Sequence, residues 1–205
     1  MSENSYPTNI GIFTCNRPQA LRRLLDSLLE SEENSEGSLR YVIHDDSKDL
    51  AIRQQNFEIL RDFRKSSNPD VLYIDIEAKR QLAEILNRDY RLASEILEFG
   101  LFDPEDTGLA YGANYNAMLL QNVGEMYLTL DDDTISHCAN PPAKKEGLGF
   151  HAGSDPRKIW FFKDSVSAIE SLTWKSESTR DVHSQLLGRK LSELHPNPEQ
   201  LFKEL

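Results

Sequence analysis

NIGIFTCNRPQALRRLLDSLL, residues 9–29, is the stretch that decides the fold. Its first part, Asn9–Cys15, is an apolar run of strand length that ends at the turn residues Asn16-Arg17-Pro18. From Pro18 onward, leucines recur at three- and four-residue spacing, which is typical of an amphipathic helix, and proline suits a first helical turn. A buried strand that runs directly into a helix indicates an α/β fold.

The alternation of strands and helices continues to the middle of the chain. Apolar runs predict further strands at residues 39–44, 71–76 and 125–130, and helical spacing predicts helices at about 52–68, 79–99 and 111–123. This alternation predicts a mostly parallel sheet with helices on both faces. Ligands of such sheets bind beyond the carboxyl ends of the strands.

The pattern weakens after Asp133. Residues 138–153 are rich in proline and glycine and are predicted to form a loop. A short strand is predicted at 159–162, a helix at 178–194, and a short helix around Leu201 and Phe202. We therefore expect an α/β domain over residues 1–135 and a loop and helical extension of the same domain over residues 136–205.

Composition and charge exclude several classes of protein. Hydrophobic residues make up 39% and charged residues 28%, as in globular proteins. The net charge of −11 opposes contact with phosphate backbones, so no nucleic-acid partner is expected. No apolar run approaches the roughly 18–20 residues of a membrane span, and the first residues do not resemble a signal peptide, so a cytoplasmic location is expected. Cys15 and Cys138 are too few for a disulfide framework.

Three polar clusters follow predicted strands: Thr14-Cys15-Asn16-Arg17, Asp45-Asp46-Ser47 and Asp131-Asp132-Asp133. The carboxyl ends of parallel strands meet at one edge of the sheet, so the clusters are expected to converge. Three successive carboxylates repel one another unless a cation or strong hydrogen bonding compensates them.

The aspartate triplet is a candidate metal site. Alternate side chains of an extended segment face the same way, so Asp131 and Asp133 are the predicted ligands and Asp132 points elsewhere. A small set of hard oxygen ligands suits Mn²⁺ or Mg²⁺, which takes its remaining ligands from water and substrate phosphates. The substrate class indicated is a nucleoside diphosphate compound. The alternative for an acidic triplet is a solvated turn or a helix cap, and for Asp45-Asp46-Ser47 it is capping of the next helix by Asp46 or Ser47.

Four segments resemble, in order and spacing, the successive motifs of family 2 of the GT-A-fold glycosyltransferases: NIGIFTCNRP (9–18), YVIHDDSKD (41–49), GLAYGAN (108–114) and YLTLDDD (127–133). The resemblance covers roughly residues 8–135. It implies a GT-A (nucleotide-diphospho-sugar transferase) fold and a metal-dependent, inverting enzyme. Such an enzyme transfers a sugar from a nucleotide diphosphate sugar, here expected to be UDP-linked, to an acceptor that the sequence does not identify.

The resemblance also implies roles for residues after the first two strands. Thr14, Asn16 and Arg17 would line the nucleotide pocket. Asp45 or Asp46, with Asp46 favoured, would accept a hydrogen bond from the base.

The same resemblance assigns the rest of the donor site. Asn114 would contact the diphosphate-sugar region, and Asp132 belongs to the nucleotide-sugar site. Asp131 and Asp133 match the outer carboxylates of a DxD motif, which hold the metal and its bound diphosphate.

Two departures from the family pattern limit the assignment. Ala113 stands where the family usually has arginine, so one positive contact to the donor is missing. An inverting enzyme also needs a carboxylate base near the acceptor hydroxyl, and no segment after Asp133 matches the family motif that supplies it. The catalytic base is therefore unassigned. A non-catalytic nucleotide-sugar binding module is one alternative. A nucleotidyltransferase is another, although it usually needs a glycine-rich phosphate loop where Asn16-Arg17-Pro18 stands.

Overall fold

The computed structural model describes residues 7–32, 38–105, 107, 111–140, 142, 160–185, 187 and 189–194. These residues fall into two compact units that divide between Ser136 and His137. The first unit contains the sheet and all the predicted site residues. That the second unit extends the same domain stays a prediction.

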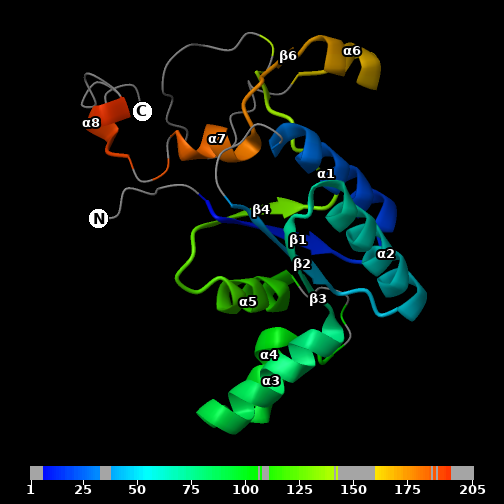
Figure 1. The fold of residues 1–205 in the computed structure, drawn as a ribbon, viewed down its shortest axis with the longest axis vertical. Coiled ribbons are helices and arrows are strands. Elements are labelled where there is room, and N and C mark those ends of the chain that lie inside the picture. Colours follow the sequence, from blue (N-terminus) through cyan, green and yellow to red (C-terminus); the bar gives the residue numbers. More distant parts are fainter. Residues whose placement is uncertain are drawn as a thin grey trace. The chain divides into compact units, whose positions relative to one another are not determined.

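A four-stranded parallel sheet lies at the centre of the first unit (Figure 1). Its strands are β1 (Asn9–Thr14), β2 (Arg40–Asp45), β3 (Asp70–Ile74) and β4 (Tyr127–Asp131), in the spatial order β3-β2-β1-β4. All three strand pairings are parallel. The predicted α/β class with a parallel sheet is confirmed, and each strand lies within two residues of its predicted bounds.

Two helices, α1 (Pro18–Glu32) and α2 (Leu50–Ser67), cover one face of the sheet (Figure 1). The leucines that recur along the sequence of α1 form the buried face of this helix. It packs with Ile10 and Ile12 of β1 and with Ile59, Leu60 and Phe63 of α2 in the largest core cluster. Burial of these side chains is the main stabilising term of the unit.

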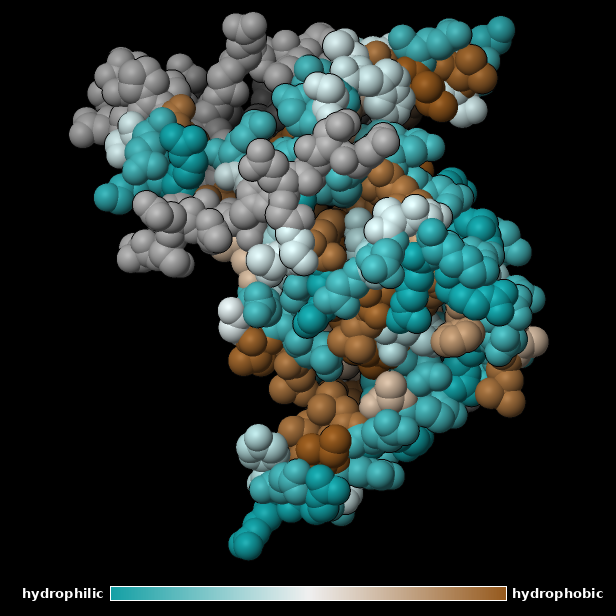
Figure 2. All heavy atoms as spheres, in the orientation of Figure 1, coloured by the Kyte–Doolittle hydropathy of each residue, from teal (hydrophilic) through white to brown (hydrophobic). Residues whose placement is uncertain are grey.

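The opposite face is covered by α5 (Tyr111–Gln121), whose Met118 is fully buried against Val42 and Ile74. Two further helices, α3 (Ile76–Tyr90) and α4 (Ser94–Leu101), pack beside α5 through Leu97, Leu101 and Ala117. Figure 2 shows apolar side chains gathered over α4 and α5. The exposed apolar residues of these two helices include Ile96, Phe99 and Leu119.

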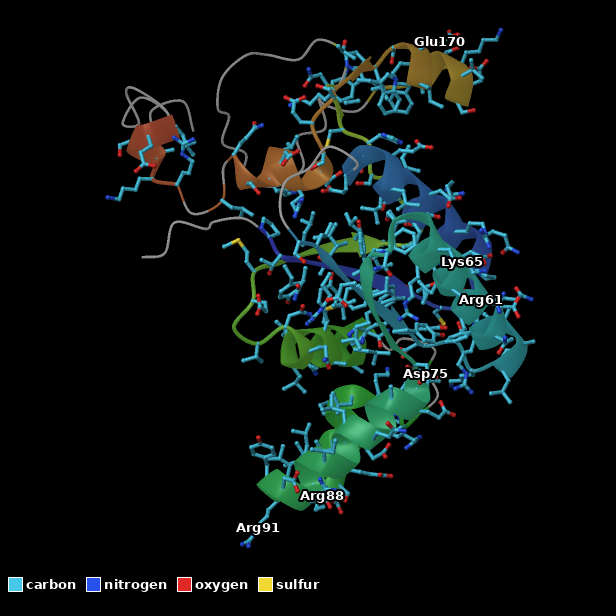
Figure 3. All side chains as sticks on the ribbon, viewed as in Figure 1. Arg61, Lys65, Asp75, Arg88, Arg91 and Glu170 are labelled. Carbon is cyan, nitrogen blue, oxygen red and sulfur yellow. The ribbon has the colours of Figure 1, made fainter. Side chains whose placement is uncertain are left out.

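The predicted single helix at 79–99 is wrong, because the chain forms α3 and α4 instead. Arg91 takes a left-handed conformation, with φ 57°, and its N–H closes the end of α3 on the carbonyl of Leu86. The side chain of Asn87 then donates to the carbonyl of Leu92 at 2.7 Å. Figure 3 labels Asp75, which caps the start of α3, and Arg91 at its far end.

Gly11 of β1 allows the close approach of α5 to the sheet. A Cβ atom at this position would lie 2.6 Å from Cε and 2.7 Å from Sδ of Met118. Gly11→Ala is therefore expected to lower the free energy of unfolding by about 1–3 kcal/mol, because Met118 is packed and must shift. Urea titration followed by circular dichroism measures the change.

Gly112→Ala is the matched control for this prediction. Gly112 lies in α5, and apart from its chain neighbours and the backbone of its own helix, a Cβ atom at this position would meet no atom of the described residues within 4 Å. Alanine there should leave stability unchanged or raise it by up to about 1 kcal/mol. Equal stability of Gly11→Ala and the wild type would contradict the close-packing argument.

In the second unit, β5 (Ala139–Asn140) pairs antiparallel with β6 (Thr173–Trp174). Its helices are α6 (Ser165–Glu170), α7 (Thr179–Ser184) and α8 (Leu191–Leu194). Within the described residues no helix is long and apolar enough to cross a membrane.

Two predictions for the second unit are wrong where it is described. Residues 160–162 are not a strand, and residue 159 lies outside the described part. The predicted helix at 178–194 is instead two short helices, α7 and α8. The capping box of Ser178 and Asp181 starts α7, and this helix ends at Ser184. Most of the predicted loop at 138–153, and the predicted helix around Leu201 and Phe202, lie outside the described residues.

Candidate functional site

The strand order identifies the edge of the sheet at which a ligand is expected. The chain runs outward from β1 through β2 to β3, and then returns through α3, α4 and α5 to place β4 on the other side of β1. The order of the strands therefore reverses between β1 and β4, and ligands of open parallel sheets bind at the carboxyl end of such a switch point. Arg17 follows β1 and the aspartate triplet follows β4 at this point.

Asp132 is fully buried and holds the ends of β1 and β4 together. Its Oδ2 accepts a hydrogen bond from Oγ1 of Thr14 at 2.7 Å, and its Oδ1 lies 2.7 Å from Nη2 of Arg17. Burial raises the pKa of Asp132 above its ordinary value, although the Thr14 hydrogen bond and the charge of Arg17 oppose that shift. Thr14, which is itself buried, and Asp132 therefore have internal roles in organising the site.

Asp131 and Asp133 are exposed on either side of this anchor. The triplet is a turn rather than the extended segment assumed from the sequence, because Thr134 N–H donates to the Asp131 carbonyl at 3.1 Å. Asp133 Oδ2 lies 3.0 Å from Nη1 of Arg17, and no described residue pairs with the Asp131 carboxylate. The Asp132 side chain was expected to point away from those of Asp131 and Asp133. It does so because of the turn and because it is buried.

The two exposed carboxylates supply part of the ligand set that a magnesium or manganese ion needs. The described residues contain no group of three or more His, Cys, Asp or Glu side chains placed to hold a metal. Mg²⁺ and similar hard cations commonly use one or two carboxylates and take their other ligands from water and substrate phosphates. Asp131 and Asp133 match that smaller donor set, with Arg17 beside it as a fixed positive charge.

Asp45 is fully buried and has its acceptors occupied within the protein. Its Oδ1 accepts from the N–H of Ser47 at 2.8 Å, and its Oδ2 accepts from Nδ2 of Asn56 at 2.8 Å and from the hydroxyl of Tyr73. Burial, followed by the bond to Asp45, raises the pKa of Tyr73 far above its ordinary value, so the hydroxyl stays a donor. Asp45 therefore fixes the loop after β2.

Asp46 points toward α3 and α5 and keeps one acceptor free. Its Oδ1 forms an ion pair with Nζ of Lys79, which is 2% exposed. Its Oδ2 is buried without a hydrogen-bond partner among the described residues. Nζ of Lys79 also donates to Oδ1 of Asn114 at 3.0 Å. The favoured base-binding residue, Asp46, and the predicted diphosphate-sugar contact, Asn114, are thus brought together by one lysine.

Asn16 has a backbone role at this edge. It takes a left-handed conformation, with φ 56°, and its N–H donates to Oγ of Ser47 at 2.8 Å, which joins the loops after β1 and β2. The alternative role of Asp46 or Ser47 as a helix cap is wrong, because Asp49 caps α2 by accepting from Ala51 N–H.

His44 and Cys15 lie in the same region but do not suit catalysis. His44 is buried with no partner for either ring nitrogen among the described residues, and burial with the charge of Lys79 lowers its pKa to about 3. Its imidazole is therefore neutral near pH 7. Partial burial and the nearby charges of Asp46 and Asp45 raise the pKa of the Cys15 thiol, which disfavours the thiolate.

Sequence reasoning missed the partners of the two aspartates at the end of β2. Lys79 and Asn56 are buried, and Tyr73 is partly buried. One signal for Lys79 was present. It shares a helical stripe with Leu82 and Leu86, at i, i+3 and i+7, so the lysine stands on the face that the pattern predicts to be buried.

Comparison with known proteins adds no further assignment. No protein-family model matches the chain, and a search of curated proteins finds no match.

Proposed function

We propose that the chain is the donor-binding portion of a metal-dependent, inverting glycosyltransferase with a GT-A fold. The observation that carries the proposal is the placement of Arg17, Asp131 and Asp133 at the carboxyl edge between β1 and β4, where the strand order reverses. Positive charge and exposed carboxylates at this point suit a cation with a bound diphosphate. The donor is expected to be a UDP-linked sugar, and the acceptor and the catalytic base are unassigned.

Each group has a defined task in this proposal. Asp131 and Asp133 hold Mn²⁺ or Mg²⁺, and the half-exposed Arg17 contacts the phosphates. Exposed ion pairs contribute little net free energy, so the Arg17–Asp133 pair yields readily to a cation. The buried Asp132 keeps the turn and Arg17 in place. When bound, the cation neutralises charge that develops on the departing nucleoside diphosphate.

Calorimetry with UDP in the presence and absence of Mn²⁺ tests the proposal. Wild type is expected to bind UDP with Mn²⁺, and Asp133→Ala is expected to bind it about 10- to 100-fold more weakly, because one metal ligand is lost. Asp89→Ala removes an equal charge at the far end of α3, where Asp89 pairs with Arg88, and should bind like wild type. If wild type fails to bind UDP with Mn²⁺, the proposal is wrong.

The main alternative is a nucleotide-sugar binding module without turnover. Hydrolysis of several nucleotide sugars separates the two, because hydrolysis of the donor needs no acceptor. UDP binding without any hydrolysis favours the binding module. A nucleotidyltransferase is a weaker candidate, since the turn at Asn16 leads through Arg17 to Pro18 without a glycine-rich loop.

A further inference from the structure

Helix α5 is apolar on both of its long sides, although other described residues cover only one of them. The covered side packs on the sheet through Met118, which is fully buried, and against α4 through Ala117. The opposite side carries Tyr115, Leu119 and Leu120, which are all exposed. A helix that is apolar all round normally lies in the interior of a protein. The exposed side of α5 therefore lacks the cover that such a helix usually has.

The exposed apolar residues of α5 continue onto α4. Nδ2 of Asn116 in α5 donates to the carbonyl of Gly100 in α4 at 2.9 Å, which holds the two helices against each other. Apolar side chains gather over both helices in Figure 2. The large exposed apolar residues of α4, of α5 and of the turn after α5 are here called the outer face: Ile96, Phe99, Tyr115, Leu119, Leu120 and Val123.

The outer face has the area of an interface between two proteins. Phe99 is 81% exposed and Val123 is 78% exposed. With roughly 150–250 Å² for each fully exposed side chain of these sizes, the six exposed fractions correspond to about 700–800 Å². The largest apolar patch on a typical monomer covers about 300–600 Å². Each partner of a stable complex buries about 800 Å².

The α5 part of the outer face carries no charge. Residues 107–124 contain no Asp, Glu, Lys, Arg or His, in a chain of which 28% of the residues are charged. Charged side chains occur at the α4 edge, where Glu98 pairs with Arg80. An uncharged centre with a polar rim is typical of protein interfaces.

The charge of the chain favours a second copy over other occupants. The net charge is −11, so two copies repel each other except where charge is absent, and the outer face is such a place. An anionic lipid surface would meet the same repulsion without basic residues on α5 to offset it. A basic protein would find no carboxylate on α5 to pair with.

We propose that the outer face is the interface of a homodimer, in which a second copy of the chain covers it. In a two-fold dimer the same patch lies on both subunits, so α5 packs against α5 of the partner subunit. This packing supplies the missing cover of the helix. Because α5 also carries Asn114, which accepts from Lys79, the interface supports a helix that borders the candidate site. The proposal does not depend on the proposed function, since it rests on burial and charge alone.

Sedimentation equilibrium of the full chain tests the proposal. Wild type is expected to have twice the chain mass of 23.5 kDa at a concentration of about 10 μM, because interfaces of this area have micromolar or lower dissociation constants. Leu119→Glu puts a carboxylate in the outer face of both subunits, and is expected to weaken association by at least about 100-fold. Phe99→Glu makes the same change on α4 and carries the test if the first variant does not fold. Circular dichroism checks the fold of each variant.

Leu50→Glu is the matched control. Leu50 is 72% exposed and begins α2, which covers the other face of the sheet, and a glutamate is favourable in a first helical turn. This variant adds the same charge and should keep the wild-type mass.

The possible outcomes decide the proposal. Dissociation of Leu119→Glu and Phe99→Glu, with Leu50→Glu still dimeric, supports the outer face as the interface. A wild type that stays monomeric at about 100 μM overturns the proposal and leaves the face to a different partner. A dimer that both folded variants leave intact overturns it too, since another surface must then join the copies. Equal dissociation of Leu50→Glu also counts against it, because added negative charge anywhere would then be sufficient.

Discussion

Replacement of Asp45 by alanine is expected to lower the free energy of unfolding by about 3–5 kcal/mol. The loss arises because three donors lose their acceptor together: the buried Ser47 N–H and Asn56 amide, and the partly buried Tyr73 hydroxyl. Asp45 is fully buried, so bulk water does not reach it in the folded chain.

Hydrogen exchange of the β1 and β2 backbone amides measures the loss of stability of Asp45→Ala in the first unit itself. Trp160 and Trp174, the two tryptophans of the chain, lie in the second unit, so tryptophan fluorescence would report on the wrong part. Asp62→Ala removes a half-exposed carboxylate on the surface of α2 and should leave stability close to that of wild type. Similar values for the two variants would show that Asp45 is not the anchor of the β2 loop.

The different roles of Asp45 and Asp46 were predictable in part from strand alternation. Side chains two apart on a strand share a face, so Asp45 lies with Tyr41 and Ile43 on the side of α1 and α2. Asp46 continues the opposite face, which holds His44. The sequence did not identify the partners, because Asn56 and Tyr73 become neighbours of Asp45 only when α2 and β3 pack on β2.

The break between α3 and α4 shows where periodicity fails. Leucine and isoleucine continue at helical spacing through the break, and neither glycine nor proline marks it. The chain turns at Arg91, whose left-handed backbone is uncommon for a residue with a Cβ atom. The side chain of Asn87 supports the turn through the Leu92 carbonyl, and this contact depends on a geometry that spacing alone does not encode.

The aspartate triplet was predicted to converge with the loop after β1, and the contacts of Arg17 with Asp132 and Asp133 confirm that convergence. Parallel topology alone supports such a prediction, because the strand ends meet at one edge. The fixed position of Asp132 was not predictable, since it depends on burial against Thr14. Metal binding by Asp131 and Asp133 stays a prediction.

Lowering the pH from 7.5 to 5 is expected to destabilise the first unit through His44 by about 2 kcal/mol. Burial, together with the charge of Lys79, lowers the pKa of His44 from 6.5 to about 3 in the folded chain. The unfolded chain therefore takes up a proton below pH 6.5 while the folded chain does not, so stability falls as the pH decreases from about 6.5 toward 3. Each pH unit within this window costs about 1.4 kcal/mol.

His44→Leu isolates this contribution from that of the carboxylates. Neither ring nitrogen of His44 has a partner among the described residues, so leucine breaks no side-chain hydrogen bond with them and takes away the titrating group. Urea titrations at pH 7.5 and pH 5 measure the free energy of unfolding. Its decrease between these two pH values should be about 2 kcal/mol smaller for His44→Leu than for wild type. Parallel pH profiles for wild type and His44→Leu would mean that the buried imidazole accepts a proton in the folded state, with Lys79 or Asp46 moving to accommodate it.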